Sequence, residues 1–122
     1  MSEKTRILVC VKCRAPGETK DMPFEQRMGG RLYAQVAAAA RDADDLIVEP
    51  VECFSVCNRP VTVGVGGRGK WLTLYGDYPM QSAEDIIAAA RMHGRTGDGI
   101  IPKDVRPPEL KKRTISRTPP VA

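Results

Sequence analysis

Four cysteines in two closely spaced pairs are the residues of this 122-residue chain best suited to chemistry. Cys10 and Cys13 are separated by two residues, Cys53 and Cys57 by three, and 39 residues lie between the pairs. Four thiolates could hold a [2Fe–2S] cluster, two on each iron, or a structural zinc ion. Alternatively, Cys10 and Cys13 could form a redox dithiol. Two disulfides are a fourth arrangement, although a cytosolic compartment would keep them reduced.

The residues around the first pair weigh against the dithiol without deciding between the metals. A redox Cys-x-x-Cys usually opens a helix, whose N-terminus lowers the pKa of the nucleophilic thiol. Here Cys13 is followed by Arg14, Ala15, Pro16 and Gly17, which is the composition of a loop. Spacing alone favours iron–sulfur over zinc, and zinc over the dithiol, and leaves all three open.

Each cysteine pair lies at the C-terminal end of a predicted strand. Residues Arg6–Val11 are apolar and β-branched, as expected of a buried strand, and Leu46–Val51 has the same character. Pro50 cannot donate to a sheet ladder, which indicates an edge position or the end of the strand. Carboxyl ends of parallel strands form the usual ligand crevice of an open α/β sheet. Since neighbouring strands lie roughly 4.8 Å apart, the four sulfurs could converge on one centre.

The remaining elements complete a predicted α/β fold. A stripe of apolar residues predicts a helix over residues 25–42, firm from about Arg31 because Gly29 and Gly30 weaken its first turn. Residues 61–65 and 70–75 predict a β-hairpin around a glycine-rich turn. Ser82 is expected to cap a helix from Ala83 to about His93. This order resembles the thioredoxin-like arrangement, a central mixed sheet of about four strands with helices on its faces.

The positive charge is concentrated at the C-terminal end. Residues 1–102 hold thirteen Lys/Arg and thirteen Asp/Glu, whereas residues 103–122 hold six Lys/Arg against two Asp/Glu. The second segment also contains four prolines, which interrupt helices and sheets. We therefore expect a domain over 1–102 and an extended, basic, loosely packed tail over 103–122.

Composition excludes several functional classes. No apolar run is longer than Val36–Ala40, which is far below the roughly 20 residues of a membrane helix. The N-terminal segment has no apolar signal stretch. A neutral body without aromatic residues interleaved among basic ones argues against nucleic acid. We expect a cytoplasmic protein that binds neither membranes nor nucleic acid.

Four further residues have simpler roles by prediction. Trp71 is expected to pack in the core or cap the sheet. His93, the one histidine, falls at a helix C-terminus, where the helix dipole favours a cation. Asp77 and Asp98 are expected to bond to amides of their own turns.

The run from Val51 to Val63, VECFSVCNRPVTV, resembles the second half-site of thioredoxin-like [2Fe–2S] ferredoxins and of the small subunit of respiratory complex I. Those proteins carry Cys-x3-Cys followed closely by Pro and a β-branched strand, although the ferredoxins usually have a wider first pair. Nearly the full length also resembles an uncharacterised bacterial family of predicted metal-binding proteins. The shared features are both cysteine pairs, Gly69-Lys70-Trp71, Tyr75-Gly76-Asp77 and the segment 98–102.

The resemblance implies a ferredoxin-like electron carrier, so a non-enzymatic role is favoured over an enzymatic one. A zinc-binding structural or metal-delivery protein, or a thiol–disulfide oxidoreductase that uses Cys10 and Cys13, are the alternatives. Cys10, Cys13, Cys53 and Cys57 would hold one [2Fe–2S] cluster, with zinc as the alternative metal. The partner would be a redox protein, and Lys12 and Arg14 beside the site would steer an acidic one. Thioredoxin-like ferredoxins can also form homodimers, so a homodimer is a further expectation.

Overall fold

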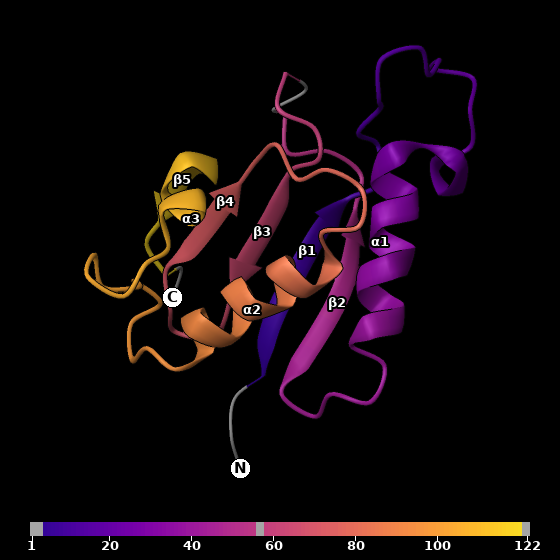
Figure 1. Ribbon diagram of the computed structural model, residues 1–122. Helices are drawn as coiled ribbons and strands as arrows, with labels where there is room; N and C mark the ends of the chain where they lie inside the picture. Colours follow the sequence, from indigo (N-terminus) through magenta and orange to yellow (C-terminus); the bar gives the residue numbers. More distant parts are fainter. Residues whose placement is uncertain (1–3, 56–57, 121–122) are drawn as a thin grey trace.

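The computed structural model describes residues 4–55 and 58–120 (Figure 1). Its strands are β1 (Thr5–Cys10), β2 (Leu46–Val51), β3 (Val63–Gly66), β4 (Leu72–Tyr75) and β5 (Thr114–Thr118). Its helices are the 3-10 turn η1 (Phe24–Gln26), α1 (Met28–Ala39), α2 (Ala83–Gly94) and α3 (Pro108–Arg113). None of the helices in this described part of the chain has the length and apolar character needed to cross a bilayer.

The five strands form one mixed sheet in the order β2-β1-β3-β4-β5. β1 runs parallel to β2, with Thr5 opposite Leu46 and Cys10 opposite Val51. The pairs β1–β3, β3–β4 and β4–β5 are antiparallel. The predicted parallel unit and hairpin are both confirmed, and β2, which contains Pro50, lies at an edge as expected.

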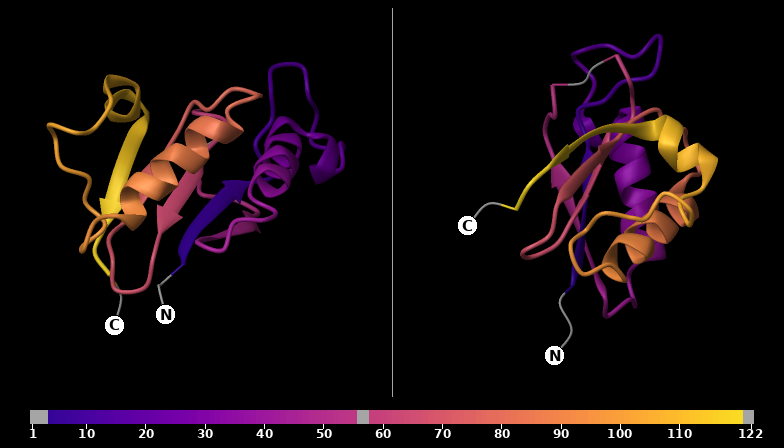
Figure 2. Two further views of the ribbon diagram at one scale, coloured as in Figure 1. Left: turned by 60° about the horizontal axis from the view of Figure 1, so that its bottom comes forward. Right: turned by 90° about the vertical axis from the view of Figure 1, so that its left-hand side faces the viewer.

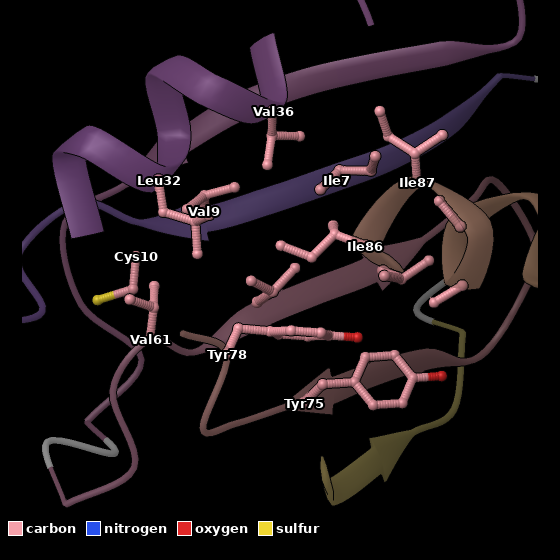
Figure 3. Close-up of a cluster of buried hydrophobic side chains, with 14 of the residues drawn as sticks. Ile7, Val9, Cys10, Leu32, Val36, Val61, Tyr75, Tyr78, Ile86 and Ile87 are labelled. Carbon is pink, nitrogen blue, oxygen red and sulfur yellow. The ribbon is translucent and has the colours of Figure 1, made fainter. Parts of the chain in front are cut away.

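Helices α1 and α2 pack side by side on the same face of this sheet (Figure 2). Strand residues that point toward them, such as Ile7 and Val9, are completely buried. Figure 3 shows Leu32 and Val36 of α1 and Ile86 of α2 meeting these strand residues. The helices therefore do not cover both faces as expected, because a single two-layer core buries the apolar stripes of both.

The C-terminal segment is folded, so the expectation of a loosely packed tail is wrong. Helix α3 and strand β5 both lie within residues 103–122, and β5 adds a fifth strand beside β4. Leu110 anchors the segment in the core and is 6% exposed. Pro107 and Pro108 occupy the cap and the first turn of α3, where the missing amide hydrogen costs nothing. The prolines thus start a helix here instead of preventing one.

Candidate metal centre

Strand geometry brings the first pair and Cys53 to the same end of the sheet. Cys10 is the last residue of β1, and Cys53 follows the end of β2 by two residues. Because these neighbouring strands are parallel, both chain exits lie at the upper edge in Figure 1. Cys10, Cys13 and Cys53 all line one cavity of about 750 Å³. Cys57 lies outside the described residues.

The backbone of the first pair is fixed from three sides. The Cys10 amide donates to the Thr62 carbonyl (3.0 Å), and the next amide donates to Val51 of β2 (2.9 Å). The Cys13 carbonyl accepts from Gly29 at the start of α1 (3.0 Å). Both side chains are buried, with Cys10 4% and Cys13 7% exposed. This pair therefore belongs to the rigid part of the fold, and Figure 3 shows the Cys10 sulfur pointing out of the core cluster.

Two glycines make this close packing of α1 possible. A Cβ at Gly29 would overlap the Cys10 carbonyl oxygen, and a Cβ at Gly30 would overlap the Phe24 carbonyl oxygen. The expectation that the firm helix starts near Arg31 is wrong for this reason. Helix α1 begins at Met28, and its glycines serve close approach to the cysteine loop.

The two thiols of the first pair interact. A side-chain hydrogen bond from Cys13 lowers the pKa of Cys10 to about 6, assisted by backbone amides and opposed by burial. The Cys10 sulfur also lies 3.9 Å from the Glu52 carbonyl oxygen, in the segment that leads to Cys53. A thiol that ionises this readily is suited to metal ligation or to nucleophilic attack.

Cys53 differs from the first pair because it is exposed. Its sulfur accepts a hydrogen bond from the Ser55 amide at 3.1 Å. Ser55 has a left-handed backbone (φ 63°), which closes the tight turn around the sulfur. Amide hydrogen bonds to a ligating sulfur are among the means by which proteins set cluster potentials.

Arg27 ties the loop that carries Cys13 to helix α1. Its guanidinium donates to the carbonyls of Met22 (2.9 Å), Lys12 (3.2 Å) and Lys20 (2.6 Å). The side chain is 5% exposed and its charge lies over the Phe24 ring at 4.8 Å. Sequence reasoning missed Arg27, because nothing in its neighbourhood marks an arginine before a helix as a loop clamp.

Cations dominate the lining of the cavity. Lys12, Arg14, Lys20 and Arg27 line it, whereas Glu18 is the one carboxylate among the described lining residues. Glu18 is itself engaged, since it accepts from the amides of Ala15 (2.7 Å) and Met28 (2.9 Å). The positive excess favours an anionic occupant such as a thiolate-ligated metal centre.

The donor set fits a thiophilic metal, but the described part does not complete a site. Within 4–55 and 58–120, no three His, Cys, Asp or Glu side chains are close enough together to hold a metal ion. The predicted fourth ligand, Cys57, falls outside these ranges. Three thiols on one cavity, one of them with a pKa near 6, are nevertheless the ligand chemistry that iron–sulfur clusters and zinc require.

A family model described as "Protein of unknown function (DUF1636)" matches residues 7–120. The chain belongs to that family. No relative was found among curated proteins.

Solved structures similar to the chain are thioredoxin-like [2Fe–2S] ferredoxins from Aquifex aeolicus. One has 20% identity and a TM-score of 0.59, covering 98% of this chain and 96% of its own. A 1.5 Å structure of the wild-type ferredoxin has 20% identity and a TM-score of 0.54, and the match covers 94% of this chain and 99% of the ferredoxin chain. A cysteine-to-serine variant of the ferredoxin has 18% identity and a TM-score of 0.54, and the match covers 92% of this chain and 98% of the variant's chain. The expected thioredoxin-like fold is thereby confirmed.

Trp71, His93, Asp77 and Asp98 are not among the residues that line the thiol cavity. Trp71 is half-buried and lies outside the core cluster. His93 lies in the last turn of α2, as expected, but it is completely buried and its Nε2 lies 2.8 Å from the Trp71 carbonyl oxygen. Asp98 accepts from the Ile100 amide as predicted. Asp77 instead pairs with Arg59 (2.7 Å), which is distant in sequence. Ser82 donates to the Pro79 carbonyl and makes no cap bond.

Proposed function

We propose that this protein is an iron–sulfur electron carrier that holds one [2Fe–2S] cluster on Cys10, Cys13, Cys53 and Cys57. The supporting observation is that the three described cysteines line one cavity at the carboxyl ends of β1 and β2. This cavity occurs in a fold shared with thioredoxin-like [2Fe–2S] ferredoxins. When bound, the cluster would supply one-electron transfer to a partner protein.

The chain's own residues would set how that centre behaves. Burial of Cys10 and Cys13 limits access of water, and the Ser55 amide donates a hydrogen bond to the Cys53 sulfur. Lys12 and Arg14 on the cavity wall favour the more negative, reduced state and so raise the potential. They also give the thiol end of the molecule a positive surface for an acidic redox partner in the cytoplasm. Dimerisation remains part of this proposal.

Metal analysis of protein purified without oxygen tests the assignment. We expect about two irons and two inorganic sulfides per chain, with the visible absorption and reduced-state EPR signal of a [2Fe–2S] centre. Serine at any one of the four cysteines should remove most of the iron. Arg14→Ala is the matched control, since it changes the cavity wall without removing a ligand and should retain iron at a lower potential. Colourless protein with stoichiometric zinc would favour the alternative metal and contradict the proposal.

A thiol–disulfide oxidoreductase is the second candidate, favoured by the direct interaction of Cys13 with Cys10. In that reaction the Cys10 thiolate would attack a substrate disulfide, and Cys13 would then displace the substrate thiolate to leave a Cys10–Cys13 disulfide. Reduction of insulin disulfides should then vanish in Cys10→Ser and survive in Cys53→Ser. Loss of iron in both variants without any reductase activity in the native protein would exclude this candidate.

A further inference from the structure

The sheet face opposite the helices is uncovered by any helix of the described chain (Figure 2). Its side chains alternate with the core residues, so Arg6 and Leu8 point away from the layer formed by Ile7 and Val9. Leu8, Ile47 and Leu72 on this face are half-buried and lie outside the core cluster. This face of the sheet therefore carries apolar side chains that are only half-buried.

Two glycines on the central strand β3 shape this face. Gly64 and Gly66 lie opposite Leu8 and Arg6, where any other residue would project a side chain. Leu72 instead leans over Gly66, its Cδ1 3.0 Å from the position of a Cβ there. Gly66 lines a hollow of about 510 Å³ together with Leu8, Ile47 and Leu72. At Gly64 the corresponding space is filled, because Leu74 Cδ2 and Phe54 Cζ each lie 3.3 Å from the position of a Cβ there.

Four cations surround the same hollow. Lys4 and Arg6 come from the start of the chain and β1, and Arg68 and Lys70 come from the β3–β4 turn. Glu49 pairs with Arg6 at 2.9 Å. Within 4–55 and 58–120, no carboxylate forms an ion pair with Lys4, Arg68 or Lys70. Lys70 also donates a hydrogen bond to the Gly94 carbonyl oxygen at 3.0 Å, which leaves its charge without a counterion. In the described part of the chain, the apolar floor is therefore bordered by three cations that have no carboxylate partner.

We propose that this open face binds an acidic protein segment that presents carboxylates to Lys4, Arg68 and Lys70 and an apolar side chain to the floor formed by Leu8, Ile47 and Leu72. Charge complementarity identifies the occupant, because a second copy of the chain would bring two sets of the same cations together. Nucleic acid fits less well, since no aromatic side chain lines the hollow for base stacking. Burial of the apolar floor would supply affinity, and the cations would supply steering and specificity.

This surface is separate from the thiol cavity. Arg6 precedes Cys10 by four residues on β1, which corresponds to roughly 13 Å at about 3.3 Å per residue. The two hollows share no lining residue. A segment bound here would leave the thiols accessible, so the protein could be held by one acidic partner while the thiol end serves another. The proposal does not depend on which metal the cysteines bind.

Amide NMR titration of the full-length protein provides the test. The probe is a short synthetic peptide of alternating glutamate and leucine, with the corresponding lysine–leucine peptide as its charge control. The glutamate peptide should shift the amides of Arg6, Leu8 and residues 66–72, and its affinity should fall as ionic strength rises. The lysine peptide should produce no saturable shifts.

Variants then test which charges matter. Lys4→Glu with Arg68→Glu should weaken peptide binding by about tenfold or more. Lys103→Glu with Lys111→Glu makes the same change in net charge at exposed sites elsewhere and should leave binding within about twofold. Ile47→Ser tests the floor and should weaken binding while thermal unfolding confirms that the variant is folded. Shifts confined to other surfaces, equal loss in both double variants, preferential binding of an RNA oligonucleotide, or dimerisation through this face would each overturn the proposal.

Discussion

Substitution of Gly29 by alanine tests whether the first turn of α1 positions the cysteine loop. In an ordinary helix interior, Gly→Ala is stabilising by about 1 kcal/mol. Here the new Cβ would overlap the Cys10 carbonyl oxygen and lie 3.1 Å from both the Cys10 carbonyl carbon and the Cys13 Cβ. Carbon atoms pack best at about 3.5–4.0 Å, so either the helix or the end of β1 must move.

The size and sign of the effect follow from those contacts. Overpacking costs about 1–3 kcal/mol, and the upper part of that range applies because Cys10 is fixed by hydrogen bonds on both sides of β1. After the gain in helix propensity is subtracted, we expect the free energy of unfolding to fall by about 2 kcal/mol. For a chain of this length that corresponds to a melting temperature roughly 8 °C lower.

Urea and thermal unfolding of the metal-free protein, followed by circular dichroism, would measure this loss. Displacement of the loop should also speed the reaction of Cys10 and Cys13 with a thiol reagent. Gly97→Ala is the matched control, because a Cβ there meets nothing within 4 Å. A Gly29→Ala protein that is as stable as the native chain, with unchanged thiol reactivity, would refute the close-approach argument.

Two further predictions concern Arg27 and His93. Arg27→Met removes three hydrogen bonds to loop carbonyls and should lower the free energy of unfolding by about 2–3 kcal/mol and expose residues 12–23 to protease. Arg31→Met, which loses one partly exposed ion pair, should cost under about 1 kcal/mol, and equal effects would contradict the clamp. Burial lowers the pKa of His93, as does the charge of Lys70, against the opposing influence of the Trp71 carbonyl and Asp98. The folded state therefore binds that proton less readily than the unfolded chain. The free energy of unfolding should reach its full value above pH about 6.5 and should decline as the pH falls below it. In the His93→Gln variant, the free energy of unfolding from urea titrations should change less with pH over this acidic range. An unchanged slope of that free energy against pH would show that other groups cause the decline.

The sequence alone determined the local elements and the chemistry of the thiols. The apolar, β-branched run of residues 6–11 predicted β1, Pro50 predicted an edge position or the strand's end for β2, and the positions of the cysteines predicted pairs at strand ends. These features depend on side-chain type and on the missing amide of proline, which are properties of short segments. For the described cysteines, the shared end of the sheet then follows from the parallel β1–β2 pairing.

Only the tertiary structure decided how distant segments meet. The hydrogen bonds from Arg27 to three loop carbonyls form only when α1 packs against the end of β1. The same packing leaves no room for a Cβ at Gly29. The C-terminal segment becomes a helix and a strand because Leu110 enters the core and β4 offers an unpaired edge. Which face of the sheet stays uncovered is likewise fixed by α1 and α2 sharing one core. Such contacts depend on sequence separation and register, so no local pattern in the chain contains them.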